Sequence, residues 1–183
     1  MSSNDRAPVI SVVGKSGVGK TTALEKIIRE LKRRGYRVGT VKHDTHGFEI
    51  DQPGKDSWRH AQAGSDAVAI SSPHRVALIR QLQAEMPLDD IVPLMGEVDL
   101  VLTEGYKRGD KPKIEVTRRA RGTELLCGPD ELIAILTDYP VEMPVPQFDL
   151  DDAAGVVDLL EKLYLRRNPE PSTESAGREG RGV

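Results

Sequence analysis

The chain has 183 residues, of which 38% are hydrophobic and 30% charged, and its formal net charge is -3. These values indicate one soluble domain with a core of its own, and they exclude a general attraction to nucleic acid or to an anionic membrane. The single cysteine excludes an internal disulfide, no apolar run approaches the ~20 residues that span a bilayer, and the polar N-terminus lacks the layout of a signal peptide, so we expect a cytoplasmic protein.

The first part of the chain predicts strands that alternate with helices. Short β-branched apolar runs are typical of buried strands, and apolar residues at helical spacing between charged ones predict an amphipathic helix that ends at Gly35. The predicted elements are a strand over 7–13, a helix over 21–34, a strand over 36–42 and a short helix over 57–63. A polar loop with glycine and proline breakers joins the last two.

The second part continues the alternation. We predict strands over 66–72, 97–105, 112–118 and 131–138 and a closing helix over 151–166, whereas 75–82 fits either a strand or a helix. The fold class is therefore α/β, a mostly parallel, doubly wound sheet of the P-loop NTPase type with helices on both faces and some antiparallel or dimer-forming strands in the middle. Residues 8–166 form the predicted domain, after a flexible 1–7 and before a polar, disordered tail over 167–183.

The stretch "GKSGVGKT" has the Walker A spacing, Gly14-x-x-x-x-Gly19-Lys20-Thr21, between a predicted strand and a predicted helix. Glycines let the backbone turn its N–H groups toward a phosphate, and the helix adds its positive end. Lys20 would reach the β- and γ-phosphates, and Thr21 would hold Mg²⁺. The predicted phosphate-binding residues are Gly14, Lys15, Ser16, Gly17, Val18, Gly19, Lys20, Thr21 and Thr22.

Lys15 gives this loop an additional lysine near its start. In one branch of P-loop proteins the loop reads G-K-G-G-x-G-K-T, and the early lysine contacts phosphate, often across a dimer interface. The loop here is similar, with Ser16 in place of a glycine. A solvated loop lysine is an equally good interpretation.

Acidic residues follow two of the predicted strands. Glu104 ends the strand in "VLTEG", and Asp44 follows the strand that ends at Lys42. Ligands of doubly wound sheets bind at the carboxyl ends of the strands, so both carboxylates would lie near the loop. We predict that they assist Mg²⁺ binding with Thr21 and position the water for hydrolysis, although Glu104 could simply end a strand before a turn.

The loop "VKHDTHGFEIDQPGKDS" contains His43 and His46 beside Asp44. Two histidines and one aspartate without a cysteine make a weak transition-metal site, so a polar loop without metal is the better interpretation. Lys42, Lys55 and Asp56 could line a site for a second anionic ligand.

Asp138 ends a late predicted strand in "AILTDYP". An aspartate in such a loop can accept hydrogen bonds from N1 and N2 of guanine, which adenine does not offer. An aspartate that only ends a strand before a proline turn is equally compatible with the sequence.

Together these stretches, with "AGSDAVAI" and "PKIEV", resemble the molybdopterin-guanine dinucleotide biosynthesis adaptor protein B family from about residue 8 to 165. The resemblance implies a GTP- and Mg²⁺-binding homodimer with weak GTPase activity. It also implies assistance to the guanylyltransferase that joins GMP to molybdopterin, with molybdopterin itself or a molybdoenzyme chaperone as further candidate partners.

Two other functions share the same loop. A small-molecule kinase would place an arginine-bearing lid over the phosphates, for which "RRARGTELLCGPDE" is a candidate, and a GTPase that inserts nickel would carry a cysteine- or histidine-rich metal motif. The motifs around the P-loop argue against the kinase, and no such metal motif is present in the sequence.

Overall fold

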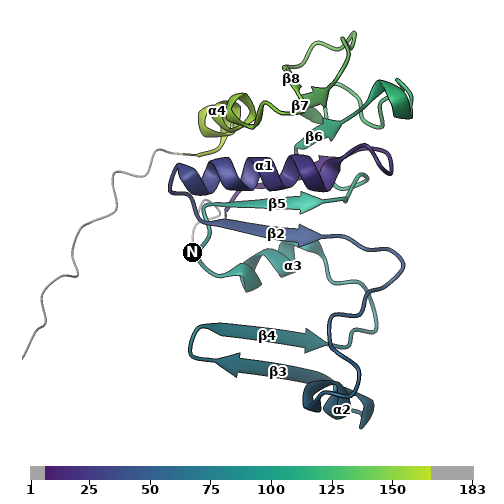
Figure 1. Ribbon diagram of the computed structural model, residues 1–183, viewed down its shortest axis with the longest axis vertical. Helices are drawn as coiled ribbons and strands as arrows, with labels where there is room; N and C mark the ends of the chain where they lie inside the picture. The colour runs from purple at the N-terminus through teal and green to yellow at the C-terminus, as the bar shows by residue number, and fades with distance from the viewer. Residues whose placement is uncertain (1–6, 166–183) are drawn as a thin grey trace, which may run out of the picture.

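A computed structural model describes residues 7–165, and a parallel six-stranded sheet forms its centre (Figure 1). The strand order is β2-β5-β1-β6-β7-β8, and every pairing is parallel. The strands are β1 (Val9–Val13), β2 (Val38–Lys42), β5 (Leu100–Glu104), β6 (Lys113–Val116), β7 (Leu132–Thr137) and β8 (Gln147–Asp149). This arrangement confirms the predicted α/β class.

Two helices cover one face of this sheet. The helices α1 (Lys20–Arg33) and α4 (Ala153–Leu163) pack against each other and against the same side chains of the strands. Alternate strand residues point toward them, and Ile10, Leu102 and Ile114 are fully buried there beside Ile27 of α1. Every second residue of these strands therefore packs against the apolar stripe that repeats every 3.6 residues along the helices. The predicted 151–166 helix is shorter at both ends.

The other face is covered by shorter segments that the sequence did not predict. The helix α3 (Leu88–Ile91) and the 3₁₀ turn η1 (Val92–Met95) pack on Val41 and Val101, and Figure 1 shows α3 beside β2. The loops after η2 (Arg119–Arg121) and β7 cover Val13, Leu132 and Ile135 with Cys127, Val141 and Met143. Helices therefore lie on both faces, as predicted.

A separate antiparallel hairpin lies apart from the six-stranded sheet in Figure 1. It consists of β3 (Ala67–Ser72) and β4 (Arg75–Arg80), with α2 (Asp56–Gln62) packed beside β3. The ambiguous 75–82 stretch is thus a strand. Within residues 7–165 no helix is long and apolar enough to cross a membrane. The predicted flexible 1–7, apart from Ala7, and the predicted tail over 167–183 lie outside the described residues.

Candidate nucleotide site

The loop between β1 and α1 has the backbone that a phosphate cradle requires. Gly14, Gly17 and Gly19 have φ values of 145°, 73° and 99°, which only glycine adopts without strain. A Cβ at Gly14 would lie 2.3 Å from the carbonyl oxygen of Val116, so the neighbouring strand leaves no space for a side chain. Val18 is buried in the core and fixes the loop, whereas Ser16 and Gly17 are exposed at its tip.

Lys20 folds back over this loop. Its Nζ donates hydrogen bonds to the carbonyl oxygens of Gly14 at 3.1 Å and Lys15 at 3.0 Å. These two bonds hold the ammonium group beside the cradle at the positive end of α1. An anion that entered the loop would therefore meet a fixed cation as well as backbone N–H groups.

Thr21 and Glu104 are brought together from positions far apart in the sequence. The Thr21 hydroxyl Oγ1 donates to Oε1 of Glu104 at 2.9 Å and lies 3.0 Å from Oε2. The pairing of β1 with β5 produces this contact, because Val12 is in register with Glu104. A hydroxyl and a carboxylate at the carboxyl edge of a parallel sheet supply the oxygen ligands that Mg²⁺ prefers. Thr22 follows in the first turn of α1.

Asp44 lies at the same edge but makes other contacts. Its Oδ1 accepts a hydrogen bond from the backbone N–H of His46 at 2.9 Å. Among residues 7–165 it shares no hydrogen bond with Thr21 or Glu104. Its proposed role at the magnesium ion therefore stays a prediction.

The two loop histidines do not gather with Asp44 into a metal site. The ring of His43 stacks on Tyr106 with centroids 4.3 Å apart, and its Nε2 lies 2.9 Å from Oε1 of Glu85. Across residues 7–165 no group of three His, Cys, Asp or Glu side chains could hold a metal ion.

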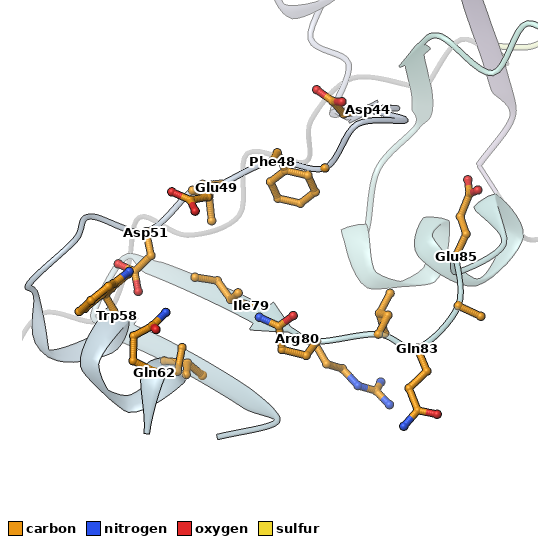
Figure 2. A pocket seen from close by; sticks show the side chains of 17 residues that line it. Asp44, Phe48, Glu49, Asp51, Trp58, Gln62, Ile79, Arg80, Gln83 and Glu85 are labelled. Carbon is orange, nitrogen blue, oxygen red and sulfur yellow. The ribbon is translucent and has the colours of Figure 1, made fainter. Parts of the chain in front are cut away.

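A cavity of about 600 Å³ opens between the loop after β2, α2 and the hairpin (Figure 2). Figure 2 shows Asp51 beside Trp58, with Phe48 on the loop and Arg80 on the hairpin. Oδ1 of Asp51 accepts hydrogen bonds from the Ser57 hydroxyl and the Gln52 backbone, whereas its buried Oδ2 has no hydrogen-bond partner within residues 7–165. No P-loop residue lines the cavity, but Asp44 does.

The three residues predicted for a second anion are spread along this part of the chain. Lys42 ends β2 in register with Glu104. Lys55 and Asp56 lie instead at the start of α2, where Asp56 is 3.8 Å from Arg59. The structure therefore brings only Lys42 to the edge that carries the P-loop.

Asp138 and three arginines lie at the ends of β6 and β7. Oδ1 of Asp138 accepts a hydrogen bond from the Arg119 backbone N–H at 2.8 Å. Nε of Arg118 donates to the Val18 carbonyl in the P-loop at 2.9 Å, and the Arg121 guanidinium lies against Gly17. From the sequence, these arginines were candidates only for the phosphate-covering lid of a kinase, an alternative that the other motifs argued against. The available sequence signal was the cluster of arginines at the end of the predicted strand over 112–118.

A buried carboxylate, Glu115, holds the segment that follows these arginines. Glu115 is 1% exposed, and its carboxylate accepts backbone hydrogen bonds from Leu126 at 2.7 Å and Cys127 at 3.1 Å. Burial raises the pKa of Glu115 above its ordinary value. Burial, with the nearby carboxylate of Glu115, also raises the pKa of Cys127 to about 11, so this thiol is protonated at neutral pH and is a poor nucleophile.

A parallel sheet whose first strand leads through such a loop into a helix defines the class of P-loop α/β proteins. The sequence model of the family described as "Molybdopterin guanine dinucleotide synthesis protein B" matches residues 9–138. The chain belongs to this MobB family.

Relatives and solved structures agree with the assignment. A molybdopterin-guanine dinucleotide biosynthesis adapter protein of Haemophilus influenzae is 35% identical, over 86% of this chain and 90% of that protein. Its counterpart in Escherichia coli is 32% identical, over 92% and 99%. A crystal structure of molybdopterin-guanine biosynthesis protein B has a TM-score of 0.66 at 29% identity, covering 85% and 98% of the two chains. The structure of Bacillus subtilis MobB has a TM-score of 0.69 at 26% identity, covering 88% and 99%.

Proposed function

We propose that this protein is a cytoplasmic GTP-binding adaptor with weak GTPase activity that assists the attachment of GMP to molybdopterin in molybdenum cofactor biosynthesis. The observation that carries the proposal is the built phosphate cradle, in which Lys20 and the Thr21–Glu104 pair flank three glycines of positive φ. Membership of the MobB family and adapter relatives at 32–35% identity support the pathway.

The same geometry supports binding and slow hydrolysis of GTP rather than nucleotidyl transfer. Mg²⁺ would be held by Thr21, with Glu104 and Asp44 acting on it directly or through water. Transfer of GMP requires attack at the α-phosphate, which a P-loop encloses in backbone. The single cysteine, Cys127, is buried with a raised pKa, so its thiol is a poor nucleophile for that attack. The transferase would therefore supply that chemistry.

We propose that Asp138 is the residue that recognises the guanine base. Its side chain is exposed at the end of β7, and the bond from Arg119 uses only Oδ1. A carboxylate there would accept hydrogen bonds from N1 and N2 of guanine. Competition of ATP against labelled GTP tests this role, and equal displacement by ATP would remove it.

The hairpin is the proposed dimer surface. Its outer face carries Val76 and Leu78, which are 77% and 61% exposed, and a hairpin of two strands is marginal alone. Pairing with the same hairpin of a second copy would cover these side chains. The adjoining cavity, with Trp58 and the buried Asp51 oxygen, would then receive molybdopterin, the transferase or a molybdoenzyme chaperone.

The test is a calorimetric titration with a non-hydrolysable GTP analogue. Wild type should bind with Mg²⁺, and Lys20→Ala should weaken binding at least roughly a hundredfold because a charge-assisted contact to phosphate is lost. Lys26→Ala is the matched control on the same helix, since Lys26 pairs with Asp151 instead. Equal affinity of wild type and Lys20→Ala would remove the phosphate-cradle assignment.

A further inference from the structure

Residues 118–124, which we call the arginine segment, lie across the P-loop at three points. Nε of Arg118 donates to the Val18 carbonyl at 2.9 Å. The Arg121 guanidinium lies over Gly17, where an added Cβ would be 3.0 Å from its Nη2. Nζ of Lys15 is 3.7 Å from Oε2 of Glu124. The segment therefore follows the loop along its exposed tip.

Both ends of the arginine segment are held by carboxylates. Asp138 accepts the Arg119 backbone N–H at 2.8 Å, at the start of η2. Glu115 accepts the backbone N–H groups of Leu126 and Cys127, just beyond the end of the segment. Because Glu115 lies in a buried strand paired with β1 and β7, the segment is positioned by the sheet that also positions the P-loop.

Arg121 differs from Arg118 and Arg119 in that no contact with a hydrogen-bond acceptor or an aromatic ring among residues 7–165 holds its guanidinium. Within residues 7–165 no hydrogen bond or ion pair holds its guanidinium, and the residue is exposed. Arg118 is fixed by Val18, and the Arg119 guanidinium lies 5.1 Å from the Tyr139 ring centre. A guanidinium beside a glycine loop that turns its N–H groups toward anions shares their preference for phosphate.

We propose that Arg121 is a phosphate-binding residue of the nucleotide site, supplied by the same chain, and that Arg118 positions it by fastening the arginine segment to the P-loop. The inference rests on the proposed GTP binding. A planar guanidinium can donate two parallel hydrogen bonds to phosphate oxygens, which suits a polyphosphate chain better than a point charge does. An added Cβ at Gly17 would lie 3.0 Å from Nη2 of Arg121, so a side chain there would shift the guanidinium slightly.

The experiment compares dissociation constants of GTP, GDP and GMP for wild type and Arg121→Ala. We expect GTP and GDP to bind roughly 10- to 100-fold more weakly to Arg121→Ala, and GMP to change by less than about twofold, because the lost bonds go to the outer phosphates. Arg121→Lys should recover only part of the affinity. Arg29→Ala, an exposed arginine paired with Glu25 on α1, is the control and should bind all three nucleotides like wild type.

Each outcome is decisive. Unchanged GTP and GDP affinity in Arg121→Ala, with a wild type that binds, overturns the role of Arg121 and leaves the proposed function standing. Equal losses for GTP, GDP and GMP would show a general effect on the site and also overturn it. A wild type that binds no GTP removes the proposed function itself. Arg121 is exposed, so the variant should fold, and a melting curve checks this.

The positioning role of Arg118 is tested by a double-mutant cycle. If Arg118 acts through Arg121, removing Arg118 should matter little once Arg121 is gone. The double variant, with both arginines changed to alanine, should then bind GTP at most about threefold more weakly than Arg121→Ala alone. Fully additive losses would show that Arg118 acts on its own. The same cycle with GMP should show no coupling, which separates positioning of a phosphate ligand from a structural effect.

Discussion

The six-stranded sheet and the β3–β4 hairpin use similar side chains in different ways. Leu100, Leu102 and Ile135 are fully buried between helices and loops, whereas Val76 and Leu78 of the hairpin are 77% and 61% exposed. The sheet thus completes its core within one chain. The hairpin leaves an apolar face uncovered, which is the surface that we propose for the dimer. One chain therefore combines a sheet with a closed core and a hairpin with an exposed apolar face.

Two leucines at strand positions give the largest contrast. Leu102→Ala should lower the free energy of unfolding by about 3 kcal/mol, because it leaves a cavity in the closed core. Leu78→Ala should change it by less than about 0.5 kcal/mol in dilute solution, since the side chain is exposed there. Urea unfolding of both variants measures the difference. Equal costs would mean that the hairpin has its own closed core.

The second prediction concerns the chemistry at the sheet edge. Glu104→Gln should slow GTP hydrolysis roughly a hundredfold, because a neutral amide cannot position magnesium or water as a carboxylate does. The amide oxygen can still accept the Thr21 hydroxyl, so the fold should be preserved. Single-turnover hydrolysis measures the rate, and light scattering should show unchanged self-association. A wild-type rate would assign Glu104 to structure alone.

The third prediction is for the hairpin, where a substitution should change self-association and leave the nucleotide site unaffected. Val76→Asp should raise the dimer dissociation constant roughly tenfold or more, because each copy would bury an unpaired carboxylate. GTP binding should be unaffected, since Val76 belongs to a different sheet from the P-loop. Analytical ultracentrifugation measures the constant. A wild type that stays monomeric at micromolar concentration would contradict the proposed dimer.

The smallest effect concerns the ion pairs that join α1 to α4. Hydrogen bonds from Arg33 and Arg34 lower the pKa of Glu30 from 4.5 to about 2, and Arg34 also contacts Glu161 of α4. A lowered acid pKa stabilises the folded state above pH 4.5, and this contribution is lost as the pH falls toward 2. The melting temperature of Glu30→Gln should therefore fall less steeply than that of wild type over this range. If the melting temperatures of the two proteins fell in parallel with pH, the stabilising role of the Glu30 carboxylate would be contradicted.

The parallel sheet and the P-loop were predictable because their signals are local and regular. The apolar run before Gly14, the Walker A spacing and the periodic helix after it agree with one another. The contact between Thr21 and Glu104 also followed from strand direction, since both lie at the carboxyl edge.

The remaining elements lack such signals. The strand β8 has three residues at a sheet edge, and η2 has three residues without an apolar period. The position of Arg121 over Gly17 depends on strand order, which brings β6 beside β1 across about a hundred residues of sequence. The sequence also does not say whether Val76 faces a core or a partner, because alternation is the same in both cases.

Reconstitution of the dinucleotide measures the central claim most directly. Purified guanylyltransferase, molybdopterin, molybdate and limiting GTP are combined with wild-type protein, with Lys20→Ala or with neither, and the guanylylated cofactor is quantified. A GTP-dependent adaptor should give a higher yield with wild type than with no addition, no gain with Lys20→Ala, and no product when this protein replaces the transferase. Product formed by this protein alone, or equal yields with wild type and Lys20→Ala, would contradict a GTP-dependent adaptor.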